Sequence, residues 1–447
     1  MTSKHLGWIG IVRLGLVQSA LGAIVVLTTS TLNRVMVVEM ALPAILPAAL
    51  VAWHYGVQLS RPRWGYGSDM GHRRTPWIIG GMGVLALGAI LATDATLMMP
   101  DNPVLGLVLS VVAYLMIGAG VGASGTSLLA LLATRVTPTR RPAAASITWI
   151  MMIVGIVVTA ATAGALLEPF SGQRLAMVST GVCAVAFLVT LLAVWNVETA
   201  PEAAPAQSAA EPKPSFRQVI AEIWAEPLAR RFAVFVFVAM LAYSAQDLIL
   251  EPFAGLVFGM TPGQSTQLAG VQNGGVLLGM ILVGAVGARA GDGSKVWMRW
   301  WTVAGCVGSA LALCALGMAA LVGPGWPLAP TVFALGLANG VFAVAAIGSM
   351  MGLAGAGRES REGVRMGVWG ASQAIAFGLG GFLGAAGVDV MRHVTGETGR
   401  AFLLVFTAEA VLFLAAAVLA SRLDLVAKPS ASPAPAGTMS AQVRGAQ

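Results

Sequence analysis

Long runs of apolar residues, separated by short polar segments, dominate the pattern along the chain. A membrane-spanning helix needs about 20 predominantly apolar residues, and twelve runs come close to that length. The pattern therefore predicts an all-α membrane protein with twelve transmembrane helices. They lie near residues 11–33, 41–60, 77–95, 104–133, 144–167, 175–196, 231–250, 266–288, 298–321, 329–353, 365–387 and 401–420.

The predicted spans form two halves of six. The first span follows a basic start with Lys4 and Arg13 but has no small-residue cleavage site, so we interpret it as an uncleaved helix. After the sixth span, a Pro/Ala/Glu-rich segment cannot bury enough surface to fold, although residues 216–224 have the spacing of a short amphipathic helix that lies on the membrane or docks a partner. The predicted division is an N-terminal half 1–197, a cytoplasmic linker 198–230, a C-terminal half 231–426 and a disordered cytoplasmic tail 427–447.

The composition excludes a water-soluble globule, because 57% of the residues are hydrophobic and only 10% are charged. Lys and Arg gather on alternate loops, and the positive-inside rule places these loops and both termini in the cytoplasm. The net charge of +7 follows from this asymmetry and indicates attraction to anionic membrane lipid, with no sign of nucleic-acid binding. The basic loops carry Arg61, Arg63, Arg73, Arg74, Arg135, Arg140, Arg141, Lys213, Arg217, Arg230, Arg231, Arg289, Lys295, Arg299, Arg358, Arg361 and Arg365, whereas the opposite loops carry Arg34, Arg174, Arg392 and Arg400.

Six helices on each side of a central loop resemble the major facilitator superfamily, whose two halves rock about a site at the membrane midplane. The loop "GYGSDMGHRRTP" after the second span resembles a loop motif of that superfamily, with Gly65, Asp69, Arg73 and Arg74 at matching positions. The Asp69 carboxylate is suited to accept hydrogen bonds from the amino end of a neighbouring helix. A basic loop that only fixes topology is the alternative.

The chain shows no sequence pattern of an enzyme. There is no nucleophile and base set, no His-Glu-x-x-His and no Walker loop, which argues against catalysis and against an ATP-driven pump. Cys183, Cys306 and Cys314 lie inside predicted spans, so we expect buried, inert thiols and no metal ion bound by the chain itself.

Several longer stretches resemble a narrower family. "RLGLVQSALGAIVVLTTSTLNRVMVVEMALPA", "GYGSDMGHRRTPWI", "AQDLILEPFAG" and "GVWGASQAIAFGLGG" are similar to the PucC/LhaA family of phototrophic bacteria. The resemblance implies that the protein binds bacteriochlorophyll, or a late precursor, and delivers it during the assembly of light-harvesting complexes. It also implies a location in the bacterial inner membrane, which includes the cytoplasmic and intracytoplasmic membranes. It implies light-harvesting polypeptides and terminal bacteriochlorophyll-synthesis enzymes as partners. The loop after Asp69 is shorter than in PucC itself, which leaves room for a relative tied to pigment synthesis.

Ionisable residues inside a membrane are costly and are functional candidates. Glu409 lies at the centre of the last span, where it lines a pigment path or makes a structural hydrogen bond. At the outer ends of the first and seventh spans, an acid in one half can meet a base in the other. We predict that these residues form an outer gate, with interfacial anchoring as the alternative. They are Arg34, Glu39, Asp247 and Glu251.

Polar side chains inside the spans are the further pigment-binding candidates. His54 is suited to ligate the magnesium of a bacteriochlorophyll, although a lone His more often serves packing. Gln18, Gln246 and Gln373 can donate to carbonyl groups of a chlorin ring, or can join helices to each other. In two copies of the text Leu-Glu-Pro-Phe, at Glu168 and Glu251, we expect Pro to end the helix.

Two function classes follow. The first is a pigment carrier and assembly factor. The second is a proton- or ion-coupled transporter of small solutes, although the fourth span lacks an intramembrane Arg and the first lacks a mid-membrane Asp.

Overall fold

The computed structural model describes six stretches of the chain, in which all regular structure is helical. These are residues 6–60, 73–137, 140–198, 227–287, 294–354 and 362–422. The first rod combines α1 (Trp8–Val26), α2 (Leu32–Arg34) and two π-helical segments, η1 (Leu27–Thr31) and η2 (Val35–Glu39). The other long helices are α3 (Ile45–Gln58), α5 (Thr75–Met98), α6 (Pro103–Arg135), α7 (Arg141–Leu166), α8 (Gly172–Val194), α10 (Pro227–Phe258), α11 (Pro262–Gly287), α12 (Ser294–Val322), α13 (Leu328–Ala354), α14 (Glu362–Thr395) and α15 (Thr398–Ser421).

Each long helix overlaps one of the predicted spans, which confirms the predicted all-α membrane fold. In the described part of the chain, eleven helices are long and apolar enough to cross a membrane, whereas α3 has only 14 residues. The first rod passes its predicted end at residue 33 and reaches Glu39. Most of the predicted linker and the whole predicted tail lie outside the described residues.

The two copies of Leu-Glu-Pro-Phe behave differently. α7 ends at Leu166, before the first copy, as predicted. The prediction was wrong for the second copy, because α10 continues through Pro252. Proline has no N–H, so the carbonyl of Leu248, four residues earlier, receives no helical hydrogen bond. The side chain of Asn33 donates to this carbonyl at 2.6 Å, and this outside donor allows the helix to continue.

Local sequence explains where several helices begin and end. Proline stands in the first turn of α5, α6 and α7, where its missing N–H is not needed. The Asn102 side chain caps α6 by accepting a hydrogen bond from the N–H of Leu105 at 3.2 Å. Gly259 follows α10 with φ of +66°, a left-handed conformation that favours glycine after a helix.

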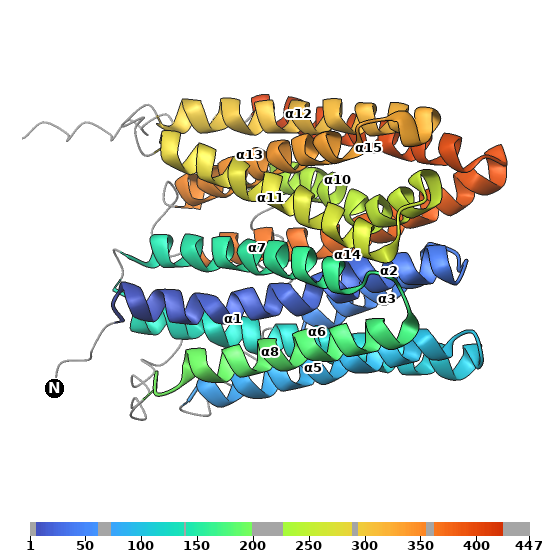
Figure 1. The fold of residues 1–447 in the computed structure, drawn as a ribbon. Helices are drawn as coiled ribbons and strands as arrows, with labels where there is room; N and C mark the ends of the chain where they lie inside the picture. The colour runs from blue at the N-terminus through green and yellow to red at the C-terminus, as the bar shows by residue number, and fades with distance from the viewer. Residues whose placement is uncertain are drawn as a thin grey trace, which may run out of the picture.

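The helix packing of one half recurs in the other. α1 packs on α7 as α10 packs on α14, and α3 packs on α6 as α11 packs on α13. α5 contacts α6 and α8 as α12 contacts α13 and α15. Figure 1 shows the blue-to-green helices of the N-terminal half below the yellow-to-red helices of the C-terminal half. Because α7 packs on α11 and α3 on α14, both halves supply equivalent helices to the boundary between them.

The two ends of the bundle are distinguished by their connections. One end carries the short turns that follow α5, α7, α10 and α14, on the right in Figure 1. We call it the outer end, because the Lys and Arg count predicts that it faces the periplasm. The amino end of α1 lies at the opposite end of the bundle (Figure 1).

Glycines bring helices to backbone contact. A Cβ atom on Gly120 in α6 would lie 2.6 Å from the carbonyl oxygen of Gly81 in α5. A Cβ atom on Gly164 in α7 would lie 2.7 Å from the carbonyl oxygen of Gly263 in α11. Both separations are too short for a real side chain, so substitution would push the helices apart. Small residues thus serve close packing, as they commonly do between membrane helices.

The thiols differ in their surroundings. Cys183 and Cys306 are buried, as predicted. The prediction was wrong for Cys314, which is exposed because its face of α12 is not covered by neighbouring helices. A thiol-labelling experiment on this protein therefore starts from the Cys314→Ser variant.

Candidate functional site

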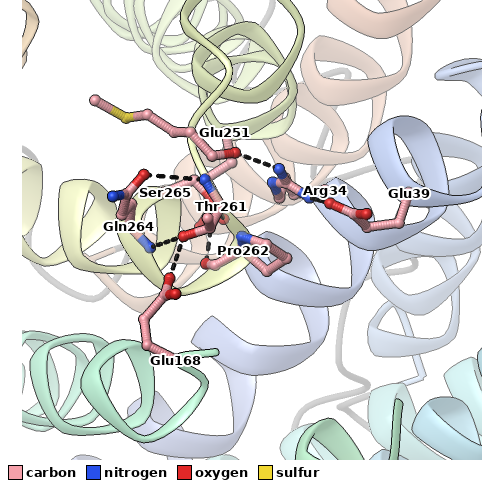
Figure 2. A network of polar contacts seen from close by, with 9 residues as sticks. Arg34, Glu39, Glu168, Glu251, Thr261, Pro262, Gln264 and Ser265 are labelled. Carbon is pink, nitrogen blue, oxygen red and sulfur yellow. Dashed lines mark hydrogen bonds and ion pairs between the residues drawn. The ribbon is translucent and has the colours of Figure 1, made fainter. Parts of the chain in front are cut away.

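Arg34 lies within a network of polar contacts at the outer end (Figure 2). It is only 2% exposed and belongs to the three-residue helix α2, between the π-helical segments η1 and η2. Single π-helical turns inside helices are frequent at functional sites. The guanidinium forms an ion pair with Glu39 and donates a hydrogen bond to the backbone carbonyl of Met260 in the other half. Arg34 therefore connects the two halves through a backbone acceptor.

Asn33 makes a second bond between the halves. Its side chain is 1% exposed, and its Nδ2 donates to the carbonyl of Leu248, which Pro252 leaves without a helical donor. A buried carbonyl without a partner costs about 1–3 kcal/mol. The N-terminal half thus satisfies a backbone group that α10 cannot satisfy itself. Pro252 inside an apolar run was the sequence signal for such an acceptor, but the sequence did not identify Asn33 as its donor.

Glu168 bridges the halves through its side chain. It accepts a hydrogen bond from the hydroxyl of Thr261, which stands just before α11 (Figure 2). The N–H of Thr261 donates to Gln264 Oε1 at 3.1 Å, and the N–H of Gln264 donates to the Thr261 hydroxyl at 3.2 Å. This reciprocal arrangement is a capping box, which fixes Thr261 at the helix start. Glu168, predicted as a turn residue, therefore also contacts the other half.

Two further contacts join the halves at this end. The hydroxyls of Thr31 and Thr266 lie 3.0 Å apart. Asp389 of α14 accepts hydrogen bonds from the N–H groups of Ala44 at 3.1 Å and Ile45 at 2.8 Å, where the amino end of α3 favours a carboxylate. Asp389 could not be predicted, because its partners are far away in sequence. We use the name outer closure for the contacts with the other half made by Thr31, Asn33, Arg34, Glu168 and Asp389.

The acids predicted to face Arg34 lie at two depths of α10. Glu251 is close enough to Arg34 for their charges to interact. Asp247 lies one turn deeper, and its charge interacts with Glu409. The ion pair that the structure shows for Arg34 is with Glu39 of its own half. The role of these residues as a gate stays a prediction.

Glu409 and Gln246 lie in the middle parts of α15 and α10. Glu409 is 3% exposed and Gln246 is fully buried. Within the described part of the chain, the polar atoms of neither side chain have a hydrogen-bond partner. The structural hydrogen bond considered for Glu409 is therefore not formed there.

His54 has the surroundings of a packed histidine. It is buried in α3, with Nε2 at 2.7 Å from Nε2 of Gln58 one turn later, and its ring packs edge-on against Tyr55. Gln18 is buried in α1, and Gln373 is half-buried in α14. The pigment-binding roles of these three side chains stay predictions.

The predicted loop motif is described only in part: Gly65 and Asp69 lie outside the described residues, whereas Arg73 and Arg74 lie within them. The amino end of α5 is held by Glu198. Its carboxylate accepts hydrogen bonds from the N–H groups of Arg74 and Thr75 and, at 2.7 Å, from the Thr75 hydroxyl. This is the kind of contact that we predicted for Asp69. Glu198 was not identified, because it is the first residue of the segment interpreted as a linker.

An apolar groove lies on the surface formed by α11, α12 and α13. Its volume is about 670 Å³, and Trp301, Gly308 and Ala338 are among the residues that line it. A second hollow, of about 570 Å³, lies beside Arg73 and Glu198.

Solved structures share this fold. A peptide transporter POT variant in complex with alafosfalin superposes with a TM-score of 0.69 at 14% identity, covering 94% of this chain and 96% of the transporter. A bacterial homolog of the human lysosomal transporter Spinster superposes with a TM-score of 0.67 at 17% identity, covering 94% and 98%. At these identities the likeness shows the fold alone, and it confirms the predicted major facilitator-like architecture.

Sequence relatives cover nearly the whole chain. A Rhodobacter capsulatus protein named bacteriochlorophyll synthase 44.5 kDa chain is 54% identical over 421 residues, which are 93% of this chain and 95% of the relative. Protein PucC of Rhodobacter capsulatus is 28% identical over 428 residues, which are 92% and 91% of the two chains. The family model described as PUCC protein matches residues 31–427. The chain therefore belongs to the PucC family.

Proposed function

We propose that this protein binds bacteriochlorophyll, or a late precursor, as cargo and delivers it during the assembly of light-harvesting complexes. One observation carries the proposal: 54% identity over 93% of the chain to a relative named as a chain of bacteriochlorophyll synthase. Similarity along the whole length supports a role in the same part of pigment metabolism. The protein holds and releases the pigment and leaves catalysis to its partners.

The fold supports a carrier. Two halves built on the same packing scheme provide a boundary at which facilitator-like proteins hold cargo and about which they rock. The outer closure joins the halves at one end, so the cargo enters from the other end or from the bilayer. The apolar groove on α11, α12 and α13 has a lining that suits the hydrocarbon tail of the pigment.

The proposed location is the inner membrane of a phototrophic bacterium, with both termini in the cytoplasm. The asymmetry of Lys and Arg between loops supports this orientation. The proposed partners are terminal bacteriochlorophyll-synthesis enzymes, supported by the printed name of the relative, and light-harvesting polypeptides, supported by the membership of the PucC family.

A deletion strain tests the proposal. We expect lower near-infrared antenna absorption in the deletion strain and normal growth when light is not the energy source. Protein purified in detergent from the phototrophic host should carry a bacteriochlorophyll absorption band and co-purify with pigment-synthesis or light-harvesting proteins. Complementation with the intact gene is the control.

The competing function is coupled transport of a small solute. It predicts unchanged antenna absorption in the deletion strain, purified protein without pigment, and a solute whose uptake depends on the protein. That set of results would overturn the proposed function.

A further inference from the structure

Four polar side chains lie within helices of the C-terminal half, and we call them the polar set: Gln246 and Asp247 in α10, Asn339 in α13 and Glu409 in α15. In the described structure, both oxygens of Glu409, both polar atoms of Gln246 and Nδ2 of Asn339 have no hydrogen-bond partner. The amide oxygen of Asn339 accepts from Ser309 at 2.8 Å. Groups of this kind cost free energy in a membrane interior unless they serve a function.

Phenylalanines flank Glu409 of the polar set. Phe406 and Phe413 stand about one turn before and one turn after Glu409 on the same face of α15, and both are fully buried. Phe406 packs against Phe253 of α10 with ring centroids 5.1 Å apart, and Phe413 packs against Phe342 of α13 at 6.2 Å. Glu409, which lies between these two rings along the helix, is only 3% exposed. A charge in such surroundings is poorly solvated, so its interactions are strong.

The charge that acts on Glu409 is another carboxylate. Asp247 is half-buried and lies close enough to Glu409 for charges on the two carboxylates to repel each other. Burial without a hydrogen-bond partner and a second carboxylate nearby both favour the neutral form of the Glu409 carboxyl group. Asp247 is the less buried of the two carboxylates.

The other ionisable groups around α15 do not neutralise this pair. On α10, Glu251 lies close to Arg34. On α14, Asp389 is bound to the amino end of α3. On α12, Cys306 is buried, and the described part of α13 has no acid or base. The remaining described titratable groups of these helices are Arg230, Arg231 and Tyr243 in α10, Arg299 and Cys314 in α12, Arg392 and His393 in α14, and Arg400 in α15.

We infer that Glu409 and Asp247 together bind one exchangeable proton, and that its binding and release shift the equilibrium between closed and open arrangements of the two halves. A proton suits the site better than a metal ion, because no group of three His, Cys, Asp or Glu among the described residues could hold a metal. This inference goes beyond the proposed function, since it does not depend on which cargo is carried.

α10 provides the mechanical connection. Asp247 is followed directly by Leu248, whose carbonyl accepts the hydrogen bond from Asn33 across the outer closure. Loss of the proton places two negative charges side by side, and α10 must shift or rotate to separate them. A movement of α10 changes the position of the Leu248 carbonyl and weakens its bond to Asn33. The proton site and the outer closure therefore share one rigid element.

Infrared spectroscopy of reconstituted, pigment-free protein tests the proton directly. At a pH at which exposed acids are ionised, we expect a C=O band of a protonated carboxyl group that shifts in heavy water. Glu409→Gln should abolish this band, and Asp247→Asn should shift it. Glu397→Gln, at an exposed acid just before the same helix, is the matched control and should leave the band unchanged. A band that persists in folded Glu409→Gln protein would overturn the inference, and Asp247→Asn provides the same test if Glu409→Gln does not fold.

A second experiment measures the separation of the two halves. In the Cys314→Ser background, a cysteine at position 266 reports separation of the outer closure, because Thr266 is fully buried beside Thr31. Its labelling rate should change with pH in the parent protein, and Glu409→Gln should abolish that response. A pH-dependent labelling rate in Glu409→Gln protein would overturn the inference. A labelling rate that depends on sodium concentration at constant pH, and not on pH, would also overturn it. Neither measurement uses pigment. Failure of the pigment assays would therefore not affect this inference, and failure of the proton measurements would not affect the proposed function.

Discussion

Replacing Asn33 by leucine removes the donor to the Leu248 carbonyl while keeping a side chain of similar size. Pro252 prevents a replacement bond from within α10, so the carbonyl is left buried without a partner whenever the halves are closed. Such a group costs about 1–3 kcal/mol, whereas hydrogen bonds between membrane helices average about 0.6 kcal/mol when alternatives exist. We expect the higher range here, which corresponds to a five- to 150-fold shift toward the open arrangement.

The assay is the labelling rate of a cysteine at position 266 in the Cys314→Ser background. The decisive comparison is a double-mutant cycle with Pro252→Ala, which returns an N–H to α10 and supplies the Leu248 carbonyl with a helical donor. In that background, Asn33→Leu should have an effect below about 0.5 kcal/mol. The control is Asn273→Leu, because the bond that the described structure shows for the Asn273 amide lies within its own helix, to the carbonyl of Ala269 at 2.9 Å. An equal effect of Asn33→Leu with and without Pro252 would refute the reasoning.

Three further predictions concern single side chains. Arg34→Ala should increase the labelling rate at the outer closure more than Glu39→Gln does. The reason is that Arg34 is buried and also donates to the carbonyl of Met260, whereas Glu39 is 37% exposed and solvent screens its charge. Equal effects of the two variants would contradict this prediction. His54→Ala should lower pigment per protein if the imidazole ligates magnesium, and equal pigment in folded mutant protein would assign His54 to packing. Glu198→Ala should lower thermal stability by about 0.5–2 kcal/mol through loss of the cap on α5, and an unchanged melting curve would exclude that role.

The spans could be predicted because the bilayer imposes one length and one polarity on every crossing segment. The largest errors came where a local rule was overridden from outside the segment. Pro252 normally ends a helix, yet α10 continues because Asn33, more than 200 residues earlier, provides the missing donor. The first rod also continues past its predicted end, to Glu39, with Arg34 and Glu39 paired within it.

The candidate site was predictable as a set of residue types but not as a set of partners. Arg34, Glu251 and Glu409 stand out because charges are rare in apolar runs. Which carboxylate meets which base depends on the depth of each residue in the bundle, and one helical turn separates Asp247, near Glu409, from Glu251, near Arg34. A sequence pattern does not give that depth.

In the outer closure, the two halves differ in how strongly their contacts depend on residue type. The two adjacent donors, Asn33 and Arg34, are side chains, whereas the acceptors at Leu248 and Met260 are backbone carbonyls. Every residue type carries a backbone carbonyl, so exchanges at Met260 keep the acceptor, whereas a donor at 33 or 34 requires a side chain with an N–H or O–H group that reaches the other half. Among sequence variants that still close, substitutions should therefore accumulate at the acceptor positions and be rare at 33 and 34. A library that randomises the four positions and is sorted for closure would show this asymmetry.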